Sequence, residues 1–262
     1  MNDYRDLPLL KKPVWTWEVP LYFFVGGTAG AAAVIGVAAD LSGAPRSLVR
    51  DARRVAAGGA ILSGPLLVAD LGRPERFLNM LRVFKPQSPM SVGAWTLAVF
   101  GGAATGAVIG GPLKRMASLV SAATGLVMAT YTGVLIGATA IPEWKKHASI
   151  LPVHFGASAL ASAASLLELL GHDEKALTEL AGVAAAIETA IGAKIEAQGG
   201  TDLTTRAGGM FSGPLPLILR LIGTRNARQA AAASALLGSL ITRVAWIEAG
   251  KKSAERSRGT GC

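Results

Sequence analysis

Charged residues are scarce in this chain. They make up 16% of its 262 residues, whereas 51% are hydrophobic and the mean hydropathy is +0.42. A soluble domain carries roughly 25% charged residues, because its surface must be covered with polar groups. The composition therefore argues against an ordinary soluble enzyme and predicts a protein embedded in a lipid bilayer.

Metal-binding residues are equally few. The chain has one cysteine, Cys262, whereas an iron–sulfur cluster needs about four cysteine ligands. It has three histidines, and a membrane b-type haem usually needs two that face each other. His147 is expected in a loop, and His154 and His172 lie at opposite ends of one apolar segment. We therefore predict no iron–sulfur cluster, no haem and no metal site on this chain.

The net charge of +9 lies in short clusters between apolar runs and in the last residues. Such clusters flank membrane helices and meet anionic lipid headgroups. No soluble basic domain is visible, so nucleic acid is not an expected partner.

Long apolar runs dominate the rest of the sequence. A bilayer-spanning helix needs about 20 mainly apolar residues. The segments that qualify run over residues 18–39, 54–71, 90–111, 116–141, 149–170, 177–197, 207–224 and 229–249. We predict an all-α integral membrane protein with about eight transmembrane helices. An even number places both chain ends on one side of the membrane, here called the terminal face.

The short connections predict a single membrane domain over residues 1–262. Within it we expect a four-helix bundle over 15–142, a second helical group over 149–249 and a disordered basic tail over 250–262. Lysine and arginine are slightly more numerous on the terminal face, and the positive-inside rule would then place that face in the cytoplasm.

The stretch DLGRPERF (residues 70–77) ends an uncharged run with an acid and an arginine. Helix directions place this stretch at the terminal face, together with the start of the first helix and the end of the fourth. Polar groups at membrane depth cost free energy and tend to be functional. We therefore expect a polar site there, formed by Glu18, Tyr22, Asp70, Arg73 and Tyr131.

Simpler interpretations remain open for these residues. Asp70 and Arg73 can form a local salt bridge that ends the helix, and Glu18 can be a water-facing carboxylate at a helix start. An interfacial aromatic belt is the favoured interpretation of the four tryptophans near this face, Trp15, Trp17, Trp95 and Trp144.

Glu188 and Arg243 lie inside predicted spans, where an unpaired charge is expensive. They can pair with each other across the sixth and eighth helices, or Glu188 can serve a proton path. Alternatively, Glu188 faces a protein–protein groove because the sixth helix is peripheral.

Several motifs together resemble the NrfD/polysulfide reductase membrane-subunit family. They are WEVPLYFFVGGTAGA, DLGRPERF, SPMSVGAWTL, TYTGVLIGATAIPEW, LPVHFGASALASAASL and RVAWIEAG, and they span nearly the whole chain in order. The resemblance implies a haem-free anchor of a respiratory oxidoreductase in the bacterial cytoplasmic (inner) membrane. The implied partners are a four-cluster ferredoxin-like iron–sulfur subunit and a molybdenum- or tungsten-dependent molybdopterin catalytic subunit.

The resemblance also implies a quinone pocket within the first four helices, for menaquinone or ubiquinone. The family's polar residue early in the first helix corresponds to Glu18 or Tyr22, its aspartate to Asp70 and its tyrosine to Tyr131. The residues expected to bind the quinone are Tyr22, Gly27, Arg73 and Tyr131. A docking rim for the iron–sulfur partner is expected from Arg76, Arg82 and Lys85.

Two other functions stay open. A small-solute transporter is compatible with helices interrupted by glycine and proline. A purely structural anchor would bind the same partner without touching quinone. In none of these roles is the chain by itself expected to catalyse a reaction on the partner's substrate.

Overall fold

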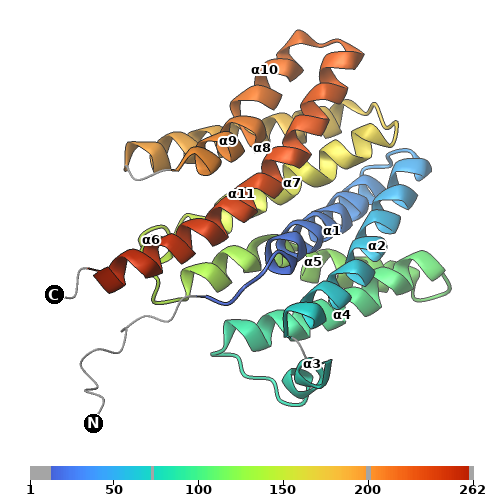
Figure 1. Ribbon diagram of the computed structural model, residues 1–262. Helices are drawn as coiled ribbons and strands as arrows, with labels where there is room; N and C mark the ends of the chain where they lie inside the picture. Colours follow the sequence, from blue (N-terminus) through green and yellow to red (C-terminus); the bar gives the residue numbers. More distant parts are fainter. Residues whose placement is uncertain (1–12, 72–73, 199–201, 260–262) are drawn as a thin grey trace.

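The computed structural model describes residues 13–71, 74–198 and 202–259, and these residues form helices and no strand. The helices are α1 (Glu18–Leu41), α2 (Arg46–Leu71), α3 (Pro74–Leu81), α4 (Pro89–Ile109), α5 (Lys114–Gly137), α6 (Pro142–Lys146), α7 (Leu151–Leu169), α8 (Lys175–Ala197), α9 (Leu203–Ser212), α10 (Pro214–Ile222) and α11 (Arg225–Gly259). The start of α1 and the end of α11 lie at the same end of the bundle (Figure 1).

Five of these helices, α1, α4, α5, α8 and α11, are long and apolar enough to cross a membrane. Large apolar side chains such as Ile61, Ile109 and Leu126 are exposed on helix surfaces. Exposed apolar surface of this kind is typical of contact with lipid. The chain is therefore an all-helical membrane protein.

The seventh predicted span is not one helix. Gly213 has a non-helical backbone and Pro214 lacks an N–H, so the segment divides into α9 and α10. Neither piece has the length of a membrane-crossing helix.

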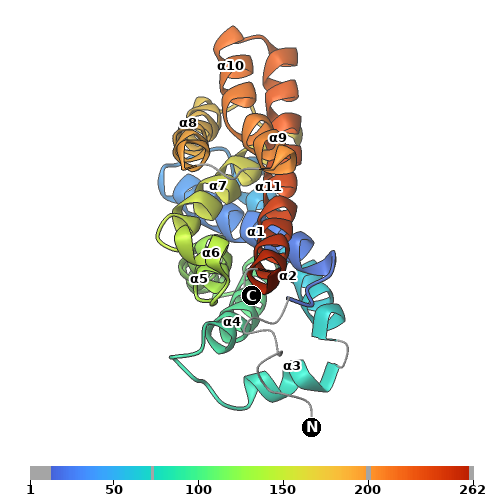
Figure 2. The ribbon, with the colours of Figure 1, turned by 60° about the vertical axis from the view of Figure 1, so that its left-hand side comes forward.

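α1 is the central helix of the structure. It packs against α2, α5, α7 and α11 (Figures 1 and 2). At its crossing with α5 the two backbones touch, because a Cβ at Gly30 would lie 2.3 Å from the carbonyl oxygen of Gly125. Small residues at such crossings let membrane helices approach closely.

The second group, α7 to α11, packs in the same way. A Cβ at Gly238 would lie 2.3 Å from the backbone nitrogen of Ser212, so α11 and α9 also meet backbone to backbone. In Figure 2, α10 lies at the edge of the molecule opposite α3.

The position of Trp144 contradicts its assignment to the aromatic belt. Its side chain is fully buried, its Nε1 donates to the Trp246 carbonyl oxygen at 2.7 Å, and its ring stacks on Trp15. Gly250 allows this, because a Cβ there would lie 2.0 Å from the Trp144 ring. Trp17, which is exposed, fits the belt better.

Residues 250–259 do not form the disordered tail expected from their charge, because they continue α11. The helix persists because it has tertiary partners there. Ala254 is buried, Ser253 Oγ accepts from the Glu143 backbone N–H, and Lys252 forms an ion pair with Asp202 at 2.6 Å.

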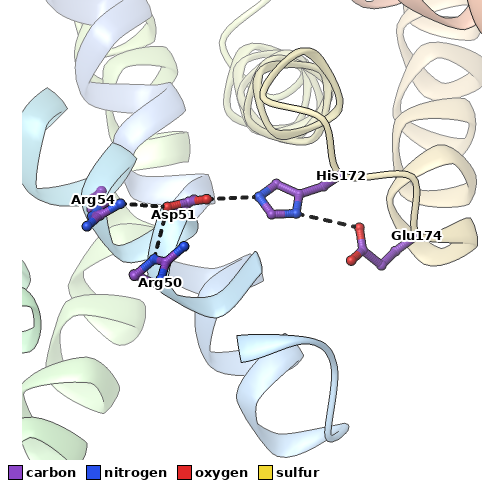
Figure 3. Close-up of polar contacts among 5 residues, drawn as sticks. All are labelled: Arg50, Asp51, Arg54, His172 and Glu174. Carbon is purple, nitrogen blue, oxygen red and sulfur yellow. Dashed lines mark hydrogen bonds and ion pairs between the residues drawn. The ribbon is translucent and has the colours of Figure 1, made fainter. Parts of the chain in front are cut away.

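At the end of the bundle opposite the terminal face, a polar cluster joins the first helical group, α1 to α5, to the second, α7 to α11. Asp51 on α2 accepts from His172, which follows α7, at 3.2 Å between Oδ2 and Nε2 (Figure 3). Arg50 and Arg54 surround the same carboxylate at 3.5 and 3.1 Å, and Glu174 lies 3.9 Å from His172 Nδ1. The cluster ties the start of α2 to the connection between α7 and α8.

Gly250→Ala tests the packing of α6 on α11. The added methyl group collides with Trp144, and overpacking typically costs ~1–3 kcal/mol. We expect a lower thermal unfolding midpoint of the detergent-purified protein, followed by tryptophan fluorescence. Gly102→Ala is the matched control, because nothing lies within 4 Å of a Cβ at Gly102. Equal midpoints for the two variants would contradict the contact.

His147 makes stability depend on pH. It is buried beside Trp246, and burial lowers its pKa, although Glu143 at 3.5 Å raises it in part. Since the unfolded histidine titrates near ~6.5, the unfolded chain binds more protons below that pH. We expect the free energy of unfolding to fall as pH drops from ~6.5, by at most about 1.4 kcal/mol per pH unit.

Two variants separate this contribution from other titrating groups. His147→Gln should flatten the dependence of the unfolding midpoint on pH, whereas Glu143→Gln should steepen it. Identical slopes for the wild type and His147→Gln would contradict the assignment.

Candidate functional site at the terminal face

A pocket opens at the terminal face where the first helical group converges. α1 and α4 line it near their first turns, α2 and α5 line it near their last turns, and α3 contributes one methionine. Its lining residues are Trp15, Val19, Tyr22, Phe23, Leu66, Leu67, Asp70, Met80, Met90, Ala94, Tyr131 and Leu135. The lining is thus mainly apolar, with a few polar groups that converge, as in many small-molecule sites.

Two tyrosines provide hydroxyl groups to this pocket from different helices. Tyr22 on α1 and Tyr131 on α5 are 4% and 7% exposed, and they are close enough to interact electrostatically. Neither hydroxyl is hydrogen-bonded to another described residue. Each can therefore donate a hydrogen bond to a polar group inside the pocket.

Gly93 on α4 makes room for Tyr131. A Cβ at this position would lie 2.1 Å from both Cζ and the hydroxyl oxygen of Tyr131. The tyrosine ring therefore lies directly against the α4 backbone, and its position depends on the missing side chain.

Asp70 supplies a carboxyl group at the end of α2. It is half-buried, lines the pocket and is close enough to Glu18 to interact with it electrostatically. Glu18 itself lies at the first residue of α1, where its Oε2 accepts from Thr16 Oγ1. Asp70 thus brings a carboxyl group to the pocket, and Glu18 lies nearby without lining it.

Gly27, which was predicted to bind the ligand, does not line the pocket. Gly27 faces the second helical group, since a Cβ there would lie 3.3 Å from Arg243 Nη2. Five residues along a helix rotate the side-chain direction by about 140°, so Gly27 cannot share the face of Tyr22. Arg73 and the side chain of Arg76 lie outside the described part of the chain.

Arg82 and Lys85 lie beside the pocket on the exposed segment after α3. They line a shallow hollow that shares Met80 and Met90 with the pocket. Val83 and Phe84 are 55% and 54% exposed in the same segment. Exposed aromatic and basic side chains together are typical of protein interfaces.

Glu188 and Arg243 are both buried, but they do not form the predicted pair directly. Neither Glu188 oxygen has a hydrogen-bond partner among the described residues. Arg243 Nη1 donates instead to Ser158 Oγ and to the Ser239 carbonyl oxygen, each at 2.9 Å. Glu188 is 1% exposed and lines a cavity between α8, α9 and α11.

Sequence reasoning missed the contributions of α3, α4 and Trp15. Met80, Met90 and Gly93 carry no charge or hydrogen-bonding group, so polarity did not reveal them. The motif SPMSVGAWTL, which contains Met90 and Gly93, was the available signal.

The chain matches the family model described as polysulfide reductase, of the NrfD type, over residues 7–256. No curated protein matches the chain. The match covers nearly its whole length and confirms the resemblance drawn from the sequence motifs. The chain therefore belongs to the NrfD-type polysulfide reductase family, whose members are membrane subunits of oxidoreductase complexes.

Proposed function

We propose that this protein is the quinone-reactive anchor of a respiratory oxidoreductase complex, exchanging electrons between membrane quinone and a partner iron–sulfur subunit. The observation that carries the proposal is the pocket where Tyr22, Tyr131 and Asp70 meet. Family membership supports a role in a redox complex.

The residues of the pocket fit a quinone headgroup. Its apolar walls suit a hydrophobic ring, and the hydroxyls of the two buried tyrosines, which bond to no other described residue, suit its two carbonyl oxygens. A bound quinone would supply two-electron, two-proton redox chemistry. In this proposal Tyr22 and Tyr131 hold and orient the two carbonyls by donating hydrogen bonds.

Protons need a route that the tyrosines alone do not provide. Asp70 lines the pocket, and Glu18, the first residue of α1, interacts with it electrostatically. Carboxyl groups at such positions serve as proton donors and acceptors. We assign Asp70 the proton exchange with the pocket and Glu18 the exchange with water.

Electrons would pass through a partner, for which the basic segment after α3 is the proposed docking surface. Arg82 and Lys85 are exposed next to the pocket mouth, so a cluster held there would be near the quinone. The proposed partners are a four-cluster ferredoxin-like subunit and, beyond it, a molybdopterin catalytic subunit.

We further propose that the chain crosses a bacterial cytoplasmic membrane eight times. α2, α7 and the α9–α10 pair add three crossings to the five helices that meet the length and hydropathy requirement. α2 and α7 run beside α1 over much of its length, which supports this arrangement (Figure 1).

Tyr131→Phe and Asp70→Asn test the site in the assembled complex. Loss of one hydrogen bond of ~1–1.5 kcal/mol should raise the KM for quinone by about tenfold in Tyr131→Phe. Loss of the proton donor in Asp70→Asn should lower kcat by about 100-fold or more. Glu179→Gln, an exposed carboxyl on α8, is the control. If both variants keep wild-type quinone turnover, the anchor is purely structural.

Gly93→Ala tests the same site without removing a polar group. The added methyl group displaces the Tyr131 ring, so quinone turnover should fall while the complex still assembles. Gly102→Ala on the same helix should leave turnover unchanged. Equal turnover in the two variants would show that the position of Tyr131 does not matter.

Purification from the native membrane in mild detergent distinguishes the anchor from the remaining alternative, a transporter. An anchor should bring an iron–sulfur protein with it. A small-solute transporter, for which the α9–α10 break is a supporting feature, should purify alone.

A further inference from the structure

A second cavity lies in the other helical group, between α8, α9 and the middle of α11. Its outer part is lined by Glu196 and Arg206, which are exposed at the terminal face. Its inner part reaches Glu188 and Thr242, which are buried. The cavity therefore extends from the terminal face to a carboxyl group inside the protein.

The inner wall of this cavity holds polar atoms that no described residue satisfies. Both Glu188 oxygens, His154 Nδ1 and Thr242 Oγ1 are buried without a well-formed hydrogen bond to a described residue, although the Ser158 and Ser212 hydroxyls lie close to the Glu188 carboxyl. Leaving a buried polar group without a hydrogen bond costs ~1–3 kcal/mol, and more if the group is charged. Buried polar groups that lack protein partners are usually satisfied by ordered water.

Arg243 is buried near Glu188 and interacts with it, although it is not among the residues that line the cavity. Ser158 and the Ser239 carbonyl oxygen hold its Nη1, and its guanidinium lies 5.3 Å from the Phe155 ring centroid. Its Nε and Nη2 have no partner among the described residues. Arg243 interacts with Glu188 electrostatically although the two form no direct contact, so water between them would satisfy both.

From Arg243 towards the opposite face, α7 and α11 pack closely against each other. Ser158 Oγ and Ser239 Oγ lie 2.7 Å apart, and the next buried serines on α7 are Ser162 and Ser165. Towards the opposite face, Arg220 pairs with Glu168 at 2.7 Å. The cavity lined by Glu188 does not reach Arg220 or Glu168, although Arg220 Nε and Glu168 Oε2 also lack a hydrogen-bond partner among the described residues.

We propose that this cavity is a water-filled inlet through which Glu188 exchanges protons with the aqueous phase on the terminal face only. Glu188 is the proton-accepting group and Arg243 is the barrier to the opposite face. The charged or titratable groups that share the cavity with Glu188 or interact with it are Glu196 on α8, Arg206 on α9, His154 on α7 and Arg243 on α11. The inlet is separate from the tyrosine pocket and does not depend on quinone chemistry.

Cysteine accessibility in the full-length protein tests this proposal. Cys262→Ser removes the only cysteine, and Glu188→Cys then places a thiol at the proposed site. The protein is reconstituted in oriented vesicles and treated on one side with a membrane-impermeant trimethylammonium methanethiosulfonate. Only a thiolate reacts with this reagent, so labelling requires both water access and loss of the thiol proton.

Three matched variants calibrate the result. Ala197→Cys reports the terminal face and Lys175→Cys the opposite face, since both residues are exposed at the ends of α8. Ala184→Cys, fully buried one turn before Glu188, reports the packed interior. We expect Glu188→Cys to react at least about tenfold faster than Ala184→Cys, and only from the side that labels Ala197→Cys.

Two results would overturn the proposal. If Glu188→Cys stays unlabelled while Ala197→Cys reacts, the cavity does not carry water to this position. If Glu188→Cys reacts equally from both sides, the path is a through-channel and Arg243 is no barrier. Should Glu188→Cys fail to fold, Thr189→Cys, which lines the same cavity, provides the same two-sided comparison.

Discussion

The close contact of α1 with α5 is the constraint on which the arrangement of the first helical group depends. Gly30 and Gly125 bring the two backbones together near the middle of both helices. Tyr22 lies about 12 Å from this crossing along α1, and Tyr131 about 9 Å along α5. Because the helices run in opposite directions, both tyrosines lie on its terminal side and meet at one pocket. A larger residue at the crossing would move the two helices apart, and with them the hydroxyls of Tyr22 and Tyr131.

The second helical group, α7 to α11, buries charged side chains within its span of the membrane. There, charged side chains are buried either with direct partners, as in Arg220 with Glu168, or beside a cavity, as in Glu188. In a hydrocarbon environment each unsatisfied group costs several kcal/mol, so a packed bundle without water would not tolerate Glu188 and Arg243 as they stand. The two groups of helices thus present two polar regions at the same face, one lined by tyrosines and one ending in a carboxyl.

Much of this arrangement could be predicted from the sequence. Apolar run length gave the helices, and their alternating direction brought Tyr22, Asp70 and Tyr131 to one face. The errors have physical causes. Gly27 was placed by its motif, whereas helical rotation turns it towards Arg243. The charged residues after Lys251 looked like a solvated tail, but small residues and Trp144 form tertiary contacts there. Tertiary contacts of this kind, and the break at Gly213, leave little trace in hydropathy.

The contact between Gly27 and Arg243 has a consequence for how the protein is made. Gly27 lies on α1 and Arg243 lies on α11, so α1 leaves the ribosome well before the helix that contacts it. A guanidinium is costly in lipid, so α11 enters the membrane most favourably against a bundle in which α1 and α7 already offer Ser158 and aromatic rings to receive it. Until then α1 has lipid on the face that α11 later covers. Insertion of α11 therefore completes the environment of α1, and assembly of the two groups of helices is coupled to that insertion.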